Sequence, residues 1–236
     1  GSGFVFMVGQ HLRRLTGIRK LKEMVEDGTI GKPIQIECNY SQNLGFELTP
    51  ESFRWRGDDT GCPAGSLMTM GIHHADVFNY LFGPIKTVFS YFNKLYIPAP
   101  VEDVTATIFQ YETGVLGYLG SNYASPKAVW FYVYGTEANL LCTITPPELP
   151  FEEYLLWWQQ VDQDTDVQLF EKGKTGSTKV PLAMGNPILE EIDEFADCIL
   201  TGAHPETDGE GALSALAFIR AAIESSQSGR QAKLEA

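Results

Sequence analysis

The sequence is poor in positive charge and has no long uninterrupted apolar run. Its 17 lysines and arginines are outnumbered by 30 aspartates and glutamates, which gives a formal net charge of −13. Such a surface repels phosphate backbones and anionic lipid, so we expect neither nucleic acid nor a membrane as partner. The longest apolar stretch, residues 67–82, is interrupted by His73, His74, Asp76 and Asn79, whereas a membrane span needs roughly 20 mostly apolar residues.

Cysteine is also scarce, and no two cysteines form a CxxC pair. Disulfide frameworks belong mainly to short secreted chains, and no secretory signal is visible. We therefore expect a cytoplasmic protein with reduced, structural cysteines. Gly1-Ser2-Gly3 is interpreted as a cloning remnant, so the expected domain is residues 4–236. The four cysteines are Cys38, Cys62, Cys142 and Cys198.

A third absence is the glycine-rich turn between a strand and a helix that holds a dinucleotide: no GxGxxG occurs. A metal site is not indicated either. His73 and His74 are adjacent, and neighbours on a helix point about 100° apart, so they do not easily converge on one ion. We expect neither a cofactor nor a metal to be bound by this chain itself. The 236 residues, 44% of them hydrophobic, suffice for one globular domain with a large core.

Hydrophobic periodicity predicts an α+β domain: an open, mostly antiparallel sheet with helices packed on one face. The short connections between successive strands favour antiparallel pairing. Residues 43–65 predict a long loop, of the kind that is usually functional in a compact domain. Thr16 is expected to cap the first helix. Helices are expected over residues 16–27, 65–82, 186–200 and 207–226, and strands over 4–9, 33–42, 85–93, 103–111, 115–122, 128–134, 139–143, 154–160 and 167–170.

The helix expected over residues 65–82 carries a polar stripe on a largely apolar surface. Thr69, His73, Asp76 and Tyr80 fall at i, i+4, i+7 and i+11, so they share one face. Unpaired buried polar groups cost about 1–3 kcal/mol each, so the stripe predicts partners or a water-filled pocket. A histidine with a carboxylate three residues later suits a general acid–base, while the alternative is a core histidine satisfied by that carboxylate.

The segment Gly65–Asp76 resembles the core motif of the glucose–fructose oxidoreductase / inositol dehydrogenase / rhizopine-catabolism (Gfo/Idh/MocA) family, approximately G-G-x-L-x-D-x-G-x-H-x-x-D. The resemblance spans about residues 4–234, and it is specific through the combination of its parts. The other similar segments are Val8–Arg14, Lys20–Gly31, Trp55-Arg56, Val133–Ala138, Asn186–Phe195 and Ser225–Gly229.

The resemblance implies that His73 is the catalytic acid–base acting on the substrate hydroxyl, and that Asp76 contacts substrate hydroxyls. The family's usual aspartate, four residues before the histidine, is Thr69 here. A threonine can hydrogen-bond His73 or the substrate, but it cannot accept a proton or support an imidazolium by charge. Thr69 is therefore a substrate-binding candidate. It also motivates an alternative function, a non-catalytic ligand-sensing or oligomerisation domain that retains the fold.

Further pocket positions also follow from the resemblance. His11 and Arg13 lie where the family places substrate-pocket residues, although surface polar residues after a strand would look the same. Asn43 and Arg56, on the flanks of the long loop, are additional substrate-binding candidates.

For the whole protein, the resemblance implies NAD- or NADP-dependent oxidation or reduction of a sugar, cyclitol or similar polyol. The implied fold is the glyceraldehyde-3-phosphate dehydrogenase-like C-terminal domain. The family's Rossmann domain and its E-K-P segment would precede Gly1 and are expected to be absent from this chain, which alone would be redox-inactive. The sheet is expected to form homodimer or homotetramer contacts.

Overall fold

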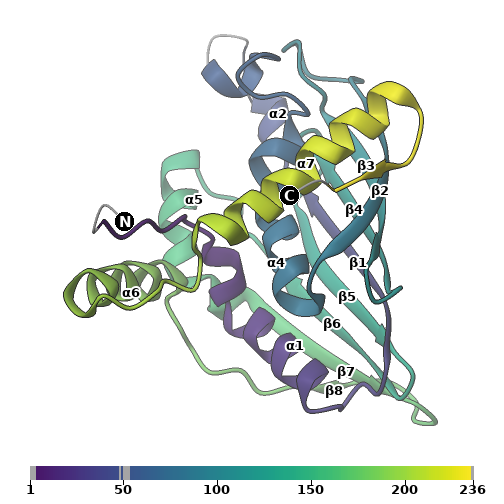
Figure 1. Cartoon of the computed structure of the whole chain (residues 1–236), viewed down its shortest axis with the longest axis vertical. Helices are drawn as coiled ribbons and strands as arrows, with labels where there is room; N and C mark the ends of the chain where they lie inside the picture. The colour runs from purple at the N-terminus through teal and green to yellow at the C-terminus, as the bar shows by residue number, and fades with distance from the viewer. Residues whose placement is uncertain (1–3, 48, 50–53, 235–236) are drawn as a thin grey trace.

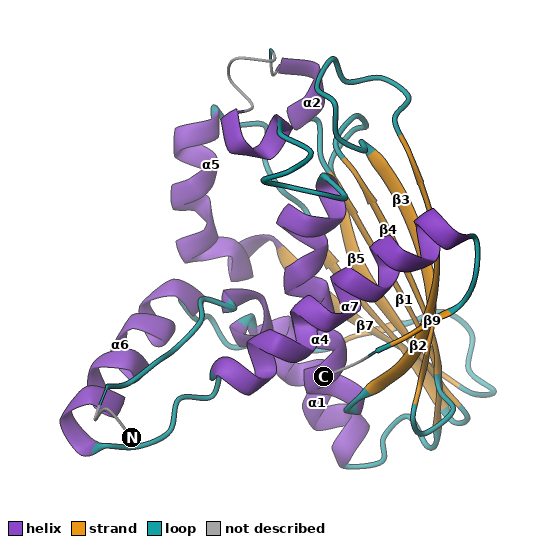
Figure 2. Ribbon diagram, turned by 45° about the horizontal axis from the view of Figure 1, so that its top comes forward, coloured by secondary structure: helices purple, strands orange, loops and turns teal. Residues whose placement is uncertain are grey.

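A computed structural model describes residues 4–47, 49 and 54–234 of the chain. Helices cover one face of a single sheet and leave its other face open (Figure 1, Figure 2). Within the described residues the sheet has nine strands, which are β1 (Pro33–Ser41), β2 (Ile85–Asn93), β3 (Val104–Tyr111), β4 (Leu116–Asn122), β5 (Ala128–Gly135), β6 (Ala138–Ile144), β7 (Thr165–Glu171), β8 (Thr178–Lys179) and β9 (Ala232–Lys233).

The strand order is β8-β7-β6-β5-β1-β4-β3-β2-β9. Every neighbouring pair is antiparallel except β1 and β4, which run parallel in the middle of the sheet. The mostly antiparallel sheet predicted from the sequence is therefore confirmed. Strand β1 illustrates why the prediction worked: Ile36 and Cys38 are fully buried while Glu37 between them is not, which is the alternation of a half-buried strand.

Two predicted strands are wrong. Residues 4–9 pair with no strand of the sheet. They run beside the loop that precedes the last helix, where the Val8 N–H donates to the carbonyl of Thr207. Residues 154–160 are helical, in α5 (Phe151–Trp157) and the 3₁₀ helix η4 (Trp158–Asp164). Tyr154, Trp157, Trp158 and Val161 are all buried, and their i, i+3, i+4, i+7 spacing is a helical signal.

The first helix begins differently from the prediction. Helix α1 (Thr16–Glu26) follows the short 3₁₀ helix η1 (His11–Arg14), and Thr16 is its first residue rather than its cap. The free Thr16 N–H donates to Asp162 Oδ1 at 3.0 Å. A carboxylate 146 residues away in sequence therefore supplies the contact that a local cap would give.

The predicted helix over residues 65–82 has two parts. A π-helical turn, η3 (Leu67–Gly71), leads into α4 (Ile72–Phe82), and π turns inside helices often mark functional sites. Gly65 precedes them with φ +43°, and a Cβ there would lie 2.0 Å from the backbone carbonyl of Glu102. In the long loop before it, the described residues contain α2 (Leu44–Glu47) and the 3₁₀ helix η2 (Arg54–Gly57).

The last two helices, α6 (Pro187–Thr201) and α7 (Gly209–Ser228), lie close to their predicted positions. Asn186 and Asp208 cap them by accepting from Leu189 N and Gly211 N. Helix α7 packs on α4 and β2, whereas α6 projects from the body of the molecule beside residues 4–9 (Figure 1). The apolar stripe of α6 is therefore largely exposed, at Leu189, Ile192, Phe195 and Ile199.

The core lies between the sheet and the layer of α1, α4 and α7. Aromatic rings from three elements meet there: Phe109 of β3 lies 4.6 Å from Phe78 of α4 and 5.3 Å from Phe218 of α7, between ring centroids. All four cysteines are free and buried. No helix of the described part of the chain is long and apolar enough to cross a membrane.

Candidate functional site

A cavity of about 230 Å³ lies where η1, the start of α4, the ends of β1 and β4, and α5–η4 come together. Its wall is more apolar than polar and carries several hydrogen-bonding side chains, as is typical of small-molecule sites. Five of the predicted site residues, His11, Asn43, Arg56, Thr69 and His73, are in this wall. The remaining residues of the wall are Leu12, Tyr40, Gln42, Met70, Tyr123, Lys127, Leu149, Tyr154 and Trp158.

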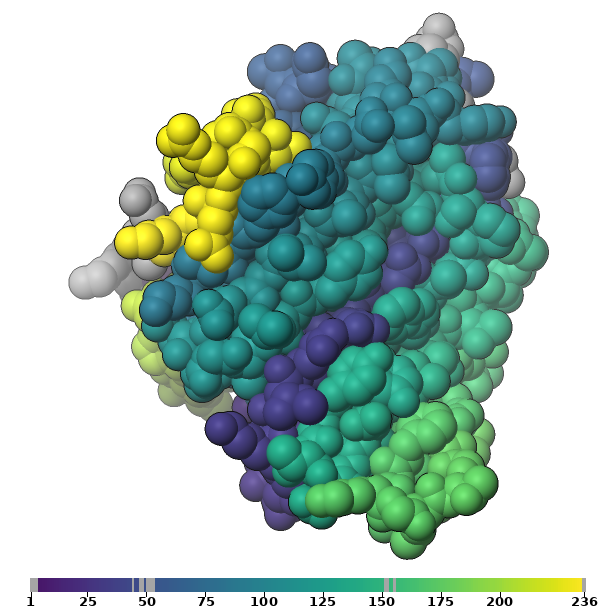
Figure 3. Space-filling model, turned by 90° about the vertical axis from the view of Figure 1, so that its right-hand side faces the viewer, coloured from purple at the N-terminus to yellow at the C-terminus, as the bar shows by residue number. Residues whose placement is uncertain are grey.

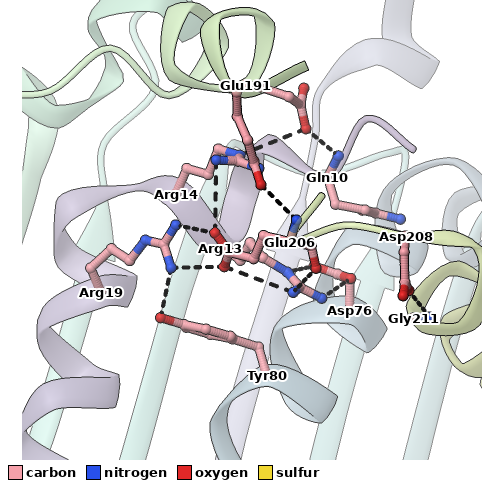
Figure 4. Close-up of polar contacts among 11 residues, drawn as sticks. Gln10, Arg13, Arg14, Arg19, Asp76, Tyr80, Glu191, Glu206, Asp208 and Gly211 are labelled. Carbon is pink, nitrogen blue, oxygen red and sulfur yellow. Dashed lines mark hydrogen bonds and ion pairs between the residues drawn. The ribbon is translucent and has the colours of Figure 1, made fainter. Parts of the chain in front are cut away.

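His73 enters the cavity from the first turn of α4, and its ring is oriented by Gln10. His73 Nδ1 lies 2.8 Å from Gln10 Oε1. An amide oxygen only accepts, so Nδ1 carries the proton and Nε2 keeps its lone pair. The Gln10 backbone N–H in turn donates to Glu191 Oε1 of α6 at 2.6 Å, as Figure 4 shows. In this tautomer the ring nitrogen with the free lone pair is Nε2.

His11 stands beside His73 on the cavity wall. Their ring centroids are 5.2 Å apart, and the His11 and Trp158 rings pack edge to face with centroids 4.9 Å apart. Burial lowers the pKa of His73 to about 4. Burial, together with the proximity of His73, lowers the pKa of His11 to about 3. Both imidazoles are therefore neutral near pH 7, and each keeps one ring nitrogen with a free lone pair.

Arg13 and Asp76 lie behind the cavity wall and contact each other. Asp76 is 1% exposed and receives two hydrogen bonds from Arg13, at 2.7 Å from Nε and 2.5 Å from Nη2 (Figure 4). The carboxylate of Asp76 does not orient His73 as the sequence spacing suggested, because Arg13 occupies it. Neither residue lines the cavity. This bidentate pair instead anchors α4 to η1.

The ion pair continues into a larger network, drawn in Figure 4. Glu206 accepts from Arg19 at 2.8 Å and 2.5 Å, and Arg19 also donates to the hydroxyl of Tyr80 at 2.9 Å. Arg14 pairs with Glu194 of α6. These contacts connect η1 and α1 to α4, to α6 and to the loop before α7, and so fix the position of Gln10 relative to His73.

Thr69, which stands in the place of the expected aspartate, is engaged with the other wall of the cavity. Its hydroxyl is hydrogen-bonded to the hydroxyl of Tyr123 and lies 3.2 Å from the carbonyl of Gly65. Asn43 donates to Glu148 Oε2 at 3.0 Å, and the guanidinium of Arg56 lies 4.5 Å from the centre of the Trp55 ring.

Several residues of the site were missed by the sequence reasoning. Gln10 had no signal, because its role depends on η1 lying beside α4. Tyr40 and Tyr123 are brought together by the parallel pairing of β1 with β4, which sequence spacing does not reveal. Trp158 and Tyr154 had a signal, the helical spacing of the aromatic residues in 154–161, although the prediction for residues 154–160 is a strand.

His74 is separate from the site. It is fully buried and its ring stacks on Phe131 with centroids 4.9 Å apart. Among the described residues, no group of three or more His, Cys, Asp or Glu could hold a metal ion. These residues also contain no strand, glycine-rich turn and helix in the order that cradles a dinucleotide, so they do not fit such a cofactor.

Comparison with solved structures shows the class of domain. The chain superposes with a TM-score of 0.90 on a structure described as a putative NADPH-dependent oxidoreductase from Desulfitobacterium hafniense, with 31% identity over 99% of this chain and 66% of the other. The fold is thus that of an α+β domain found in oxidoreductases.

The family follows from the sequence comparison. Residues 18–141 match the GFO/IDH/MocA C-terminal domain, and the chain belongs to this family. It is 22% identical to the NADP-dependent D-xylose 1-dehydrogenase of Haloarcula marismortui, over 97% of this chain and 60% of that protein. It is 25% identical to the myo-inositol 2-dehydrogenase of Thermotoga maritima, over 98% of this chain and 65% of that protein. The chain thus spans less than two thirds of the length of these relatives.

Proposed function

We propose that this chain is the substrate-binding and proton-transferring part of an oxidoreductase that acts on a sugar, cyclitol or related polyol. One observation carries the proposal: His73 lines a cavity sized for a small molecule, and its Nδ1 lies 2.8 Å from the amide oxygen of Gln10, so Nδ1 holds the proton and Nε2 keeps its lone pair. When a hydroxyl-bearing carbon is oxidised, its O–H proton must leave, and a neutral imidazole can take it. In the reverse reaction the imidazolium returns it.

The hydride partner is proposed to be NAD or NADP, because the names of similar proteins include NADP, NADPH and NADH. A nicotinamide ring would supply hydride transfer. The described residues do not fit a dinucleotide, so we assign them no step involving it. Alone, this chain is expected to be redox-inactive.

The other wall residues divide by position. His11, Thr69, Asn43 and Arg56 line the cavity and are proposed to contact the substrate. Asp76 and Arg13 are proposed to position α4 and its His73, because the Arg13 guanidinium donates two hydrogen bonds to the Asp76 carboxylate behind the cavity wall. This assignment replaces the direct substrate contact expected of them from the family resemblance.

A second candidate function is a non-catalytic binding or oligomerisation domain. Thr69 favours it, since no carboxylate supports a charged His73 from that position. The open sheet face, which Figure 3 presents, favours a role in assembly because it exposes Tyr91, Ile108 and Leu116 by 71%, 56% and 52%. We propose homo-oligomer contacts through this face with either function.

The two candidates differ in the effect of one substitution. His73→Ala is to be assayed in a protein that joins this chain to its nucleotide-binding domain, over a panel of polyols with NAD and NADP. Loss of general acid–base catalysis is expected to lower kcat by about 10²–10⁴-fold. The matched control is His204→Ala, at an exposed histidine that is not among the residues of the cavity wall. Turnover that is unchanged by His73→Ala, or absent with every substrate, would favour the non-catalytic candidate.

A further inference from the structure

The charge of the cavity wall is opposite to that of the protein. The chain carries a net charge of −13, yet the only full charges in the described wall of the cavity are those of Arg56 and Lys127. No aspartate or glutamate is among the residues of this wall. A neutral polyol needs donors and acceptors but no net charge, so two cations point to a different property of the ligand.

Lys127 is the more deeply set of the two cations. Its side chain is 7% exposed, and Nζ donates to the carbonyl of Pro147 at 2.6 Å and lies 5.0 Å from the centre of the Tyr154 ring. Burying an ammonium is costly unless it is paired with an anion. A carbonyl and a ring face satisfy it only in part, because an ammonium has three donors.

The anion that Lys127 now meets comes from the protein itself and is loosely held. The carboxylate of Glu148 lies 3.4 Å from Lys127 Nζ and accepts from Asn43 Nδ2 at 3.0 Å. Its side chain is 74% exposed. Glu148 therefore marks a carboxylate position between two residues of the cavity wall. Because its side chain is mostly exposed, it can return to water when another carboxylate takes its place, and Lys127 then keeps an anionic partner.

From this geometry we infer that the site binds a polyol bearing a carboxylate, a sugar acid, whose carboxylate replaces that of Glu148 on Lys127 and Asn43. Arg56 adds a second positive charge on the same wall. The inference rests on the proposed function, because it names the substrate class for the cavity that holds His73. A permanent surface ion pair between Glu148 and Lys127 is the alternative, and it predicts that removing Glu148 does not help any ligand.

The test is calorimetric titration of this chain with two ligands of the same carbon skeleton, D-gluconate and D-glucitol, which differ by a carboxylate against a hydroxymethyl group. A charge-assisted hydrogen bond predicts about tenfold to hundredfold tighter binding of gluconate. Lys127→Met is expected to remove this preference, so that gluconate binds no more tightly than glucitol. Glu148→Gln, at an exposed position where folding is not at risk, is expected to tighten gluconate binding severalfold and leave glucitol binding unchanged.

The outcomes separate this inference from the proposed function. Equal binding of gluconate and glucitol would overturn the sugar acid and leave the polyol site standing. No effect of Glu148→Gln on gluconate would overturn the replacement of Glu148. Tighter binding of D-glucose 6-phosphate than of gluconate would show that the cations recognise phosphate and would also overturn it. Binding of none of the three would remove both proposals.

Discussion

Lowering the pH is expected to destabilise the fold through His74. This residue is fully buried against Phe131, its Nδ1 lies 3.3 Å from the carbonyl of Met70, and its Nε2 has no hydrogen-bond partner among the described residues. Burial is the main cause that lowers its pKa to about 3. In the unfolded chain an ordinary histidine pKa of about 6.5 applies.

The sign follows from proton binding in the two states. Between pH 6.5 and the folded pKa, the unfolded chain binds more protons than the folded one, so stability falls as pH falls. Above pH 6.5 neither state is protonated and the contribution to stability is fully present. From pH 7 to pH 5, a shift of this size removes about 2 kcal/mol from the free energy of unfolding through His74 alone.

The assay is urea unfolding at pH 7 and pH 5 for the wild type and for His74→Phe. Phenylalanine keeps the stacking on Phe131 but cannot titrate, so the variant is expected to lose about 2 kcal/mol less than the wild type on acidification. Contributions from His11, His73 and the carboxylates are common to both proteins and cancel. His204→Gln, at an exposed site, is expected to keep the wild-type loss. An equal loss in His74→Phe and the wild type would refute the reasoning.

Three further predictions concern the ion pair, the backbone and the cofactor. Arg13→Met leaves Asp76 buried without its partner and is expected to lower the free energy of unfolding in urea by about 3–5 kcal/mol. The double variant Arg13→Met/Asp76→Leu is expected to recover much of this loss. Full stability of the single variant would contradict a buried pair. Gly65→Ala places a Cβ 2.0 Å from the Glu102 carbonyl and is expected to prevent stable folding, as monitored by circular dichroism. Gly114→Ala is also at positive φ but has no atom within 4 Å of its Cβ, and it is expected to lower the free energy of unfolding by about 1 kcal/mol. Equal effects of the two substitutions would argue against the close approach at Gly65. NADH and NADPH are expected not to bind this chain with micromolar affinity in a fluorescence titration, and such binding would contradict the absence of a cradle from the described residues.

The sequence was most informative where one local pattern decides the structure. The central strands were predicted within one or two residues, because inward and outward side chains alternate clearly, as in Ile36, Glu37 and Cys38. Helix α6 was predicted equally well from the spacing of its apolar residues. The apolar stripe of α6 nevertheless faces outward, since amphipathicity tells which residues share a face and not what covers it.

Tertiary contacts explain what could not be predicted. Asp162 replaces the local cap of α1, and Arg13 takes the carboxylate that spacing assigned to His73. His73 was found by motif, but its partner Gln10 lies 63 residues away, directly after the segment predicted as a strand. The two cations of the cavity wall differ in the same way. Arg56 was predicted from its motif, whereas the position of Lys127 depends on a tertiary contact, with its ammonium over the Tyr154 ring.

The central claim is that a polyol binds beside His73 and His11. The most direct measurement is NMR of the ring nitrogens of this chain, labelled with ¹⁵N-histidine, during titration with D-gluconate and D-glucitol. The four histidines provide an internal control, because two line the cavity while His74 is packed on Phe131 and His204 lies elsewhere on the surface. We predict shifts for His73 and His11 and none for His74 or His204. Saturable binding that shifts His204, or that leaves His73 and His11 unchanged, would contradict the account.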